Sequence, residues 1–496
     1  MKNDAQTKGA KTTADQMPSP TTMSLPKIIQ GGMGVAISNW KLARAVSRLG
    51  QLGVVSGTGI ETILARRLQL GDPDGSVRWA LAHFPFPAVA ERVLADYFIS
   101  GGKPASSPFR LVPLASVDTS PRFVEPVVLG AFVEVFLAKE GHKGLVGINL
   151  LEKIQLPTLP TLFGAMLAGV DCVFIGAGIP RTIPGALDRL AAGEPAQLKI
   201  NVEGSLPGEE FVSTFDPQAF CGGIATTLKR PKFFAIISSA TLAITLARKS
   251  NGRVDGFIVE GDSAGGHNAP PRGPMQISTS GEPVYGPRDV PELEKIRTLG
   301  LPFWLAGSYG QSGKLAEALR LGAAGIQVGT VFAFCEESGL QPELKRQAIK
   351  LSRAGRAEIF TDPLASPTGF PLKVAAMEGT LSDPAIFTAR KRICDIGALR
   401  RPYRKADDTI GYRCPGEPVE DYLRKGGHQE ETEGRKCVCN GLFATAGFAQ
   451  VRPGYGEEPA LVTAGNDLGR IARFVPSEGD SYTAADVTRF LLEPQC

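Results

Sequence analysis

The chain places one histidine in a setting suited to acid–base chemistry. His267 is one of four histidines, and it closes the glycine-rich segment 260–267, which follows a β-branched apolar run. An imidazole that titrates near neutrality can take a proton from a carbon acid or donate to a developing anion. A lone histidine is more often a satisfied polar residue, but this position at a strand end favours a catalytic role. Glu260 and Asp262 are predicted to orient the imidazole, or alternatively to bond the backbone.

Three further strand ends are rich in small residues. Gly31, Gly32 and Met33 follow the first apolar run, and three glycines within four residues let a backbone approach a planar ligand closely. Two later runs end in Gly307-Ser308 and Gly329-Thr330. Backbone N–H groups and a helix N-terminus at such loops bind phosphate, and a Cβ would block the phosphate oxygens. We favour phosphate binding over the alternative of tight-turn packing.

Asn149 is the remaining polar candidate. It ends an apolar run, where its amide offers both a donor and an acceptor to the edge of a planar ligand. The alternative interpretation is a cap for the helix that follows.

These candidates fall into a repeated rhythm of short strands and Ala/Leu-rich helices from Pro26 to Ser338. Such alternation predicts βα units, and eight strands are the number that closes a (β/α)8 TIM barrel. A doubly wound open sheet is the alternative, because local pattern does not show closure. The strands are expected at Lys27–Gln30, Gly53–Ser56, Gly144–Asn149, Cys172–Gly176, Phe233–Ser238, Gly256–Glu260, Phe303–Ala306 and Gly325–Val328.

Other segments stand outside this rhythm. Residues 1–25 are expected to be a flexible tail, since they are polar and lack the apolar core of a secretory signal. Residues 101–122 form a Pro- and Ser-rich insertion, and residues 197–230 are predicted to form a β-hairpin or lid. The spacing of Trp40, Ala43, Val46 and Leu49 predicts a helix over 39–49, and another is expected over 314–321, ending before Gly322.

Residues 339–496 are predicted to form a C-terminal extension packed on the barrel, and they contain five of the eight cysteines. Cations beside Cys437 are expected to lower its thiol pKa. Cys414, Cys437 and Cys439 allow an iron–sulfur or zinc site with Cys394 or Cys496 as a fourth ligand. Packing as small apolar side chains is the favoured alternative, because the Cys-x-x-Cys spacing is absent. No metal site is predicted.

The composition excludes some classes of binding partner. Hydrophobic residues make up 43% and charged residues 21%, as in ordinary soluble proteins. The net charge is +4 with Lys and Arg scattered, so a nucleic-acid surface is not expected. No apolar run reaches the roughly 18 residues of a membrane span. Eight cysteines without a regular framework favour a reduced, cytoplasmic protein.

In this order along the chain, the segments resemble the nitronate monooxygenase family, formerly called 2-nitropropane dioxygenases, together with its enoyl-reductase and quinone-reductase relatives. The resemblance covers about residues 26–338, in a long subgroup with a C-terminal extension. It rests on Ile29 to Gly34, Asn149, Ala264 to His267, Ala306-Gly307-Ser308 and Gln327 to Thr330.

The resemblance implies a flavin mononucleotide (FMN) cofactor at the mouth of a barrel, with His267 beside the reactive face. Gly31, Gly32, Met33 and Asn149 would lie near the isoalloxazine ring. The Gly266 loop would also contact the cofactor, and Gly307, Ser308, Gly329 and Thr330 would hold the phosphate.

Oxidation of alkyl nitronates with O2 is the first functional hypothesis for this small-molecule enzyme. An NAD(P)H-dependent FMN reductase of quinones or enoyl thioesters is the alternative, and a non-catalytic binding barrel is a third. The sequence leaves open the physiological substrate, the use of NAD(P)H and the oligomeric state, a homo-oligomer included.

Overall fold

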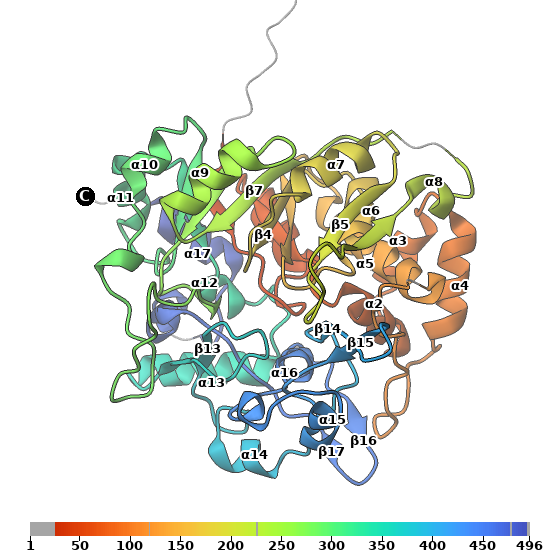
Figure 1. Cartoon of the computed structure of the whole chain (residues 1–496). Helices are drawn as coiled ribbons and strands as arrows, with labels where there is room; N and C mark the ends of the chain where they lie inside the picture. Colours follow the sequence, from red (N-terminus) through yellow and green to blue (C-terminus); the bar gives the residue numbers. More distant parts are fainter. Residues whose placement is uncertain (1–24, 119, 225–226, 477–478, 494–496) are drawn as a thin grey trace, which may run out of the picture.

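The structure is a computed structural model that describes residues 25–118, 120–224, 227–476 and 479–493 (Figure 1). The tail expected at residues 1–25 lies outside this part of the chain, apart from Leu25. One sheet holds eight strands in the order β1-β11-β10-β8-β7-β4-β3-β2, and every pairing within it is parallel. The strands are β1 (Ile28–Gln30), β2 (Gly53–Ser56), β3 (Val146–Leu151), β4 (Cys172–Gly176), β7 (Lys232–Ile237), β8 (Gly256–Glu260), β10 (Phe303–Ala306) and β11 (Gly325–Val328).

The two ends of this sheet meet. A parallel bridge joins Ile29 to Leu52, just before β2. The Gln30 N–H donates to the Leu52 carbonyl at 2.9 Å, and the Leu52 N–H donates to the Ile28 carbonyl at 3.1 Å. The sheet is therefore closed into a (β/α)8 barrel, and the alternative of a doubly wound open sheet is wrong.

All eight predicted strands are present. Five have the predicted bounds, and the other three shift by one or two residues. The largest shift extends β3 to Leu151, which places Asn149 inside the strand. The helix after β3, α6 (Thr158–Leu167), starts nine residues beyond Asn149, so the helix-cap interpretation of Asn149 is wrong.

Alternating residues of the strands point to two cores. The inward set includes Ile29, Phe174, Phe234 and Trp304, all buried. The rings of Phe174 and Phe234 stack at 5.3 Å between centroids. A barrel interior filled by bulky side chains is a packed core without a pore.

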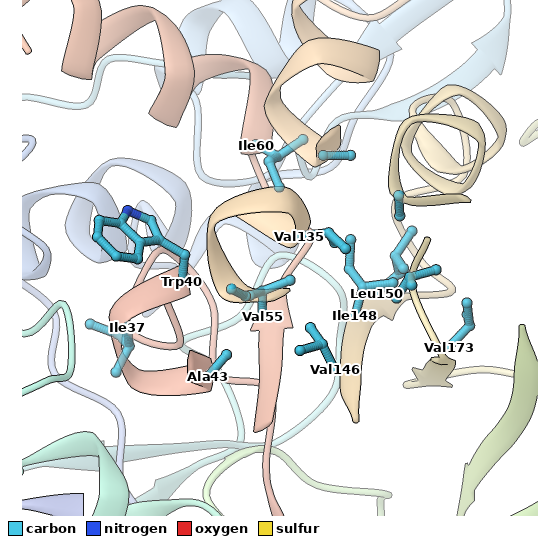
Figure 2. Packing of buried hydrophobic residues seen from close by; sticks show 14 of the residues in the cluster. Ile37, Trp40, Ala43, Val55, Ile60, Val135, Val146, Ile148, Leu150 and Val173 are labelled. Atoms are coloured by element: carbon cyan, nitrogen blue, oxygen red, sulfur yellow. The ribbon is translucent and has the colours of Figure 1, made fainter. Parts of the chain in front are cut away.

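The outward set packs against the surrounding helices. Figure 2 shows Val55 of β2 and Ile148 of β3 facing Val135 of α5 (Pro121–Lys139). Strands covered on both faces in this way appear in a sequence as nearly continuous apolar runs, which is why the sequence shows them clearly.

The predicted helix over 39–49 is α1 (Trp40–Arg48). The Asn39 side chain accepts from the Leu42 N–H at 3.0 Å and caps its first turn. Trp40, Ala43 and Val46 are buried, as their spacing predicts, but Leu49 is 41% exposed because the helix ends before it. The predicted helix over 314–321 is α11 (Lys314–Arg320).

The insertion at 197–230 contains the predicted hairpin. Strands β5 (Ala196–Ile200) and β6 (Phe211–Phe215) pair antiparallel, and the short helix α8 (Pro217–Phe220) follows. The other helices around the barrel are α2 (Ile60–Gln69), α3 (Ser76–Ala82), α4 (Pro87–Tyr97), α7 (Ile183–Ala191), α9 (Ala240–Lys249), α10 (Leu293–Arg297), α12 (Thr330–Ala333) and the 3-10 helix η1 (Pro287–Asp289).

The chain after residue 338 adds a small sheet to the barrel mouth. Strand β12 (Ile359–Asp362) pairs with β13 (Leu372–Ala375), which pairs antiparallel with β9 (Gly266–His267) of the barrel loop. In Figure 1 the elements α13, α14, α15 and α16 gather on one side of the barrel, drawn in cyan to blue.

The remaining elements of this extension are α13 (Pro342–Arg353), α14 (Pro384–Ala389), β14 (Arg401–Arg404), β15 (Ile410–Arg413), α15 (Val419–Arg424), η2 (Gln429–Thr432), α16 (Val438–Thr445), β16 (Val451–Arg452), β17 (Gly456–Glu457), η3 (Asn466–Phe474) and α17 (Ala484–Leu492). Among the described residues, no helix combines the length and the apolar composition needed to cross a bilayer.

Candidate active site

A cavity of about 220 Å³ lies at the carboxyl ends of the barrel strands. Barrel active sites form at this end, where the loops that follow the strands converge. The structure brings every site residue predicted from the sequence to the wall of this one cavity. They are Gly31, Gly32, Met33, Asn149, Gly266, His267, Gly307, Ser308, Gly329 and Thr330.

The loop after β1 is held open by two buried polar side chains. Ser38 Oγ accepts from the Met33 N–H at 2.8 Å and donates to the Gly31 carbonyl at 3.0 Å. Gln30 Nε2 donates to Ser38 Oγ at 2.8 Å, and Gln30 Oε1 accepts from the Val54 N–H at 3.0 Å. These contacts hold the loop in place, and its residues Gly31, Gly32 and Met33 line the cavity.

Gly32 lies against the side chain of Asn149. A Cβ added at Gly32 would come within 2.2 Å of the Asn149 Cβ, closer than two carbon atoms can approach. Glycine at this position therefore lets Asn149 reach the cavity wall beside the loop.

The loop after β10 presents unused backbone donors. Among the described residues, the N–H groups of Gly307, Ser308 and Tyr309 donate to no protein acceptor. Gly307 has φ 97° and Ser308 has φ 55°, so this loop runs through left-handed conformations. The next amide, Gly310 N–H, donates to the Asp467 carboxylate at 2.9 Å, which holds the end of the loop in place.

The loops at Gly329-Thr330 and at Gly266 complete the wall. Thr330 Oγ1 accepts from the Gly465 N–H at 2.8 Å, which leaves the hydroxyl hydrogen of Thr330 available as a donor. A Cβ at Gly266, where φ is 80°, would meet nothing within 4 Å. The rim is thus lined mainly by main-chain atoms and small side chains.

His267 is held by a residue of the extension. Its Nε2 lies 2.6 Å from the hydroxyl of Ser366, which is fully buried. Ser366 Oγ accepts from the Thr368 N–H at 3.2 Å, and Thr368 Oγ1 accepts from the Phe370 N–H at 3.3 Å. Ser366 Oγ also lies 2.8 Å from Thr368 Oγ1, and either hydroxyl can be the donor, so the Nε2 contact is compatible with the imidazole proton on Nε2 or on Nδ1.

The sequence did not identify this partner. Neither Glu260 nor Asp262 hydrogen-bonds His267 in the described structure, so the expectation that they orient the imidazole is wrong. Strand β9 is instead aligned by β13, in which Leu372 pairs with His267. Ser366 lies 99 residues away in the chain, and no local pattern signals a contact at that separation.

Burial shifts the pKa of two titratable groups in the cavity, His267 and Glu260. It lowers the pKa of His267 to about 4, so the imidazole is neutral at neutral pH. It raises the pKa of Glu260, at the end of β8, to about 7. A neutral imidazole is able to accept a proton, and a carboxyl group of this pKa is partly protonated at pH 7.

Residues of the extension also line the cavity, and no sequence pattern signals their presence there. They come from β13, α16 and η3 and from the segments before α13 and η3, and their side chains are mostly apolar or small. They are Leu340, Leu372, Leu442, Thr445, Thr463, Ala464 and Asp467.

The cysteines of the extension differ from expectation. Burial raises the pKa of the Cys437 thiol to about 11. The neighbouring cation Lys436 lies 3.4 Å from the Asp362 carboxylate, and the guanidinium of Arg435 donates to the carbonyls of Leu364 and Ser366. The prediction of a lowered thiol pKa is therefore wrong.

No cluster of three or more metal-binding side chains is present in the part of the chain that the structure describes. Cys496, considered as a fourth ligand, lies outside that part. Cys414 and Cys437 are buried, and Cys394 and Cys439 are half-buried.

Known proteins are similar to part of this chain. The family model for nitronate monooxygenase matches residues 217–363. A nitronate monooxygenase from Pseudomonas aeruginosa is 33% identical over 158 residues, which are 30% of this chain and 42% of that protein. The chain thus matches less than half the length of this relative.

Two solved structures align with most of this chain. FabK from Thermotoga maritima is 15% identical with a TM-score of 0.45, and the alignment covers 94% of this chain and 91% of FabK. Nitroalkane oxidase from Streptomyces ansochromogenes is also 15% identical with a TM-score of 0.45, and 94% of each chain is covered.

The family match differs in extent from the resemblance seen in the sequence. It begins at residue 217, after the loops that contain Gly31, Gly32, Met33 and Asn149. It continues to residue 363, so β12 lies within it, whereas the resemblance in the sequence extends to about residue 338. The segment 217–363, which contains His267 and the Gly307 and Gly329 loops, is the part of the chain that the nitronate monooxygenase family model matches.

Proposed function

We propose that the protein is an FMN-dependent oxidoreductase that oxidises alkyl nitronates with O2. The observation that carries this proposal is the convergence of three glycine-rich strand ends and one neutral histidine on a single cavity. The family match over residues 217–363 supports the same reaction class. In this proposal residues 26–338 form the cofactor-binding unit, and residues 339–496 complete its cavity.

The described residues fit an FMN molecule. The free N–H groups of Gly307, Ser308 and Tyr309 suit the oxygens of a phosphate, because backbone amides bind anions where no side chain intervenes. We assign Gly329, Thr330 and Gly266 to the same end of the cofactor. Gly31, Gly32, Met33 and Asn149 then lie beside the ring system, where the Asn149 amide has both a donor and an acceptor to offer.

His267 is the proposed acid–base residue. Because the imidazole is neutral at neutral pH, it is able to take a proton from an acidic carbon or to donate an N–H to a nitro oxygen. Bound FMN would supply the electron acceptor, and the protein supplies the positioning and the proton handling. Ser366 fixes the ring so that the second nitrogen is available to the substrate.

An absorption spectrum of the purified protein, followed by anaerobic titration, tests the proposal. We expect a flavin spectrum that bleaches on addition of an alkyl nitronate, and a loss of that bleaching in His267→Ala. A colourless protein would favour a non-catalytic binding barrel. Bleaching by NADPH in place of a nitronate would favour reduction of quinones or enoyl thioesters.

The setting of the protein is also a proposal. We infer a cytoplasmic enzyme that acts on small molecules, without nucleic-acid or membrane partners, on the basis of its composition and reduced cysteines. A homo-oligomer is compatible with this function, and sedimentation of the purified protein would determine the state.

A further inference from the structure

A second cavity, larger than the first, opens beside His267. Its volume is about 910 Å³, near the upper end of the roughly 300–1,000 Å³ usual for small-molecule sites. Ala177, Ile236, Glu260 and His267 line both cavities. The two spaces therefore meet at the imidazole, and we refer to the larger one as the vestibule.

Segments outside the barrel rhythm build much of the vestibule. Leu198, Lys199 and Asn201 come from the β5 strand and the turn after it, and Phe370 comes from the extension. A nitronate of two or three carbons would occupy only a small part of such a volume. The size of the vestibule therefore indicates a longer substrate.

Four cations of the vestibule have no carboxylate partner among the described residues: Lys153, Arg181, Lys249 and Arg272. The two guanidinium groups are anchored by carbonyls instead. Arg181 donates to the Lys249 carbonyl at 3.3 and 3.2 Å, and Arg272 donates to the Ser238 carbonyl at 3.0 Å. These contacts hold the groups in place and leave their charges uncompensated.

Other cations in the same region do find partners. Arg230 pairs with Asp188 at 2.8 Å and with Asp255 at 2.6 Å. Lys199 of the hairpin, which also lines the vestibule, pairs with Glu210 at 2.9 Å, so four of the five vestibule cations lack a carboxylate partner in the described chain. The unpaired set in the vestibule is therefore not a general property of this part of the surface.

The carboxyl groups of the vestibule oppose this charge only weakly. Burial raises the pKa of Glu152 and of Glu260, which favours their neutral forms. The Asp289 carboxylate accepts the backbone N–H groups of Arg272 and Gly286, both at 2.8 Å, which hold it in the loop. Asp262 is the remaining carboxylate and is exposed. Four cations without a carboxylate partner among the described residues thus line the vestibule, and such cations attract anions.

We propose that the vestibule binds the anionic end of an elongated substrate, a carboxylate or phosphate carried several atoms from the reacting carbon. The acidic carbon then reaches His267 at the junction, while the remote anion lies among the four cations. This inference rests on the proposed function and names its substrate class.

A matched pair of substrates tests this inference. The nitronates of 6-nitrohexanoate and of 1-nitrohexane have the same chain length, and only the first has a remote carboxylate. With the flavin-loaded enzyme at low ionic strength, we expect KM to be about threefold lower for the carboxylate-bearing nitronate, the effect of charge interactions with exposed cations. Phosphonate in place of carboxylate distinguishes the two kinds of anion. Added salt should reduce the difference.

Variants of single cations show which side chains lower KM for the carboxylate-bearing nitronate. Arg181→Gln and Arg272→Gln should raise KM for the carboxylate-bearing nitronate and leave KM for the uncharged-chain nitronate unchanged. Lys249→Gln should act in the same way, whereas Arg248→Gln removes the same charge from the adjacent position of α9, outside the vestibule, and should change neither constant. Equal KM values for both nitronates, or equal effects of Lys249→Gln and Arg248→Gln, would overturn the inference.

The outcome separates this inference from the proposed function. Reduction of the flavin by both nitronates with equal KM values leaves the reaction standing and rejects the anion site. If neither nitronate reduces the flavin, the proposed function fails, and calorimetric titration with octanedioate then tests the vestibule by binding alone. Heat of binding that Arg272→Gln weakens supports the site, and absence of binding overturns it.

Discussion

The Nε2 atom of His267 lies 2.6 Å from the hydroxyl of Ser366, and this contact joins the barrel loop to the extension. The pairing of β9 with β13 places the two segments side by side, since Leu372 lies opposite His267 in the register. The proposed acid–base residue therefore depends on a segment that follows the barrel, and the extension is part of the site.

Ser366→Ala should impair proton handling more than substrate binding. Without the hydroxyl, Nε2 loses its buried partner and the ring gains freedom, so we expect the rate of flavin reduction to fall by about tenfold. The pH dependence of kcat should also move, because the partner of Nε2 influences the imidazole pKa. Ser366→Thr keeps the hydroxyl and should restore both. A Ser366→Ala enzyme with the wild-type pH profile would show that the contact is only structural.

His267 should stay neutral down to about pH 4, where its burial-lowered pKa lies. Between this value and about pH 6.5, the unfolded protein binds a proton that the folded protein does not, so the free energy of unfolding should rise with pH across this interval. NMR titration of the imidazole measures the pKa directly. A midpoint near 6.5 would contradict the prediction and would indicate a solvated ring.

Glu260 should make the free energy of unfolding depend on pH in the opposite direction to His267. Its pKa in the folded protein is about 7, above the ordinary value of 4.5. Between these two values the folded protein holds a proton that the unfolded protein has released, so stability should fall as pH rises. Glu260→Gln should remove this fall, which is on the order of 3 kcal/mol. Denaturant melts at several pH values measure it, and parallel curves for both proteins would contradict it.

Gly32→Ala should reduce flavin binding without unfolding the protein. The new Cβ would come within 2.2 Å of the Asn149 Cβ and force that side chain away from the cavity wall. Overpacking of this kind costs about 1–3 kcal/mol, which corresponds to a loss of affinity of about tenfold or more. Gly469→Ala is the control, because a Cβ there meets nothing within 4 Å. Equal flavin content in the two variants would count against the assignment.

The thiols of the extension should react slowly. With a pKa of about 11, Cys437 is a thiolate in only about one molecule in a thousand at pH 8. Labelling with a disulfide reagent should therefore be slow in the native protein and fast in guanidinium chloride. Rapid native labelling of Cys437, detected by peptide mapping, would revive the interpretation of a reactive thiol.

The barrel strands were predictable because they are local. A parallel strand covered on both faces requires a short apolar run and a turn after it, and each of the eight runs contains both signals. The rim residues were predictable for the same reason. A residue such as Gly307 directly follows a strand. Active sites of barrels form at the carboxyl ends of the strands, so the position in the sequence also predicts the position in the site.

The contacts of the extension were not predictable in this way. Ser366, Asp467 and Thr445 come from segments with no regular rhythm, and what brings them to the barrel mouth is the path of the chain back over it. Their side chains carry no distinguishing pattern, since serine, aspartate and threonine occupy most surface loops.

The sequence by itself therefore determined the barrel, the strand ends that form its mouth and the histidine among them. Tertiary structure alone decided which residue holds His267, how strongly burial shifts the pKa values of His267 and Glu260, and that four unpaired cations share one vestibule. The physical reason is that these interactions act between different kinds of neighbours. Strand formation and turn geometry depend on neighbours in the chain, whereas desolvation and charge pairing depend on neighbours in space.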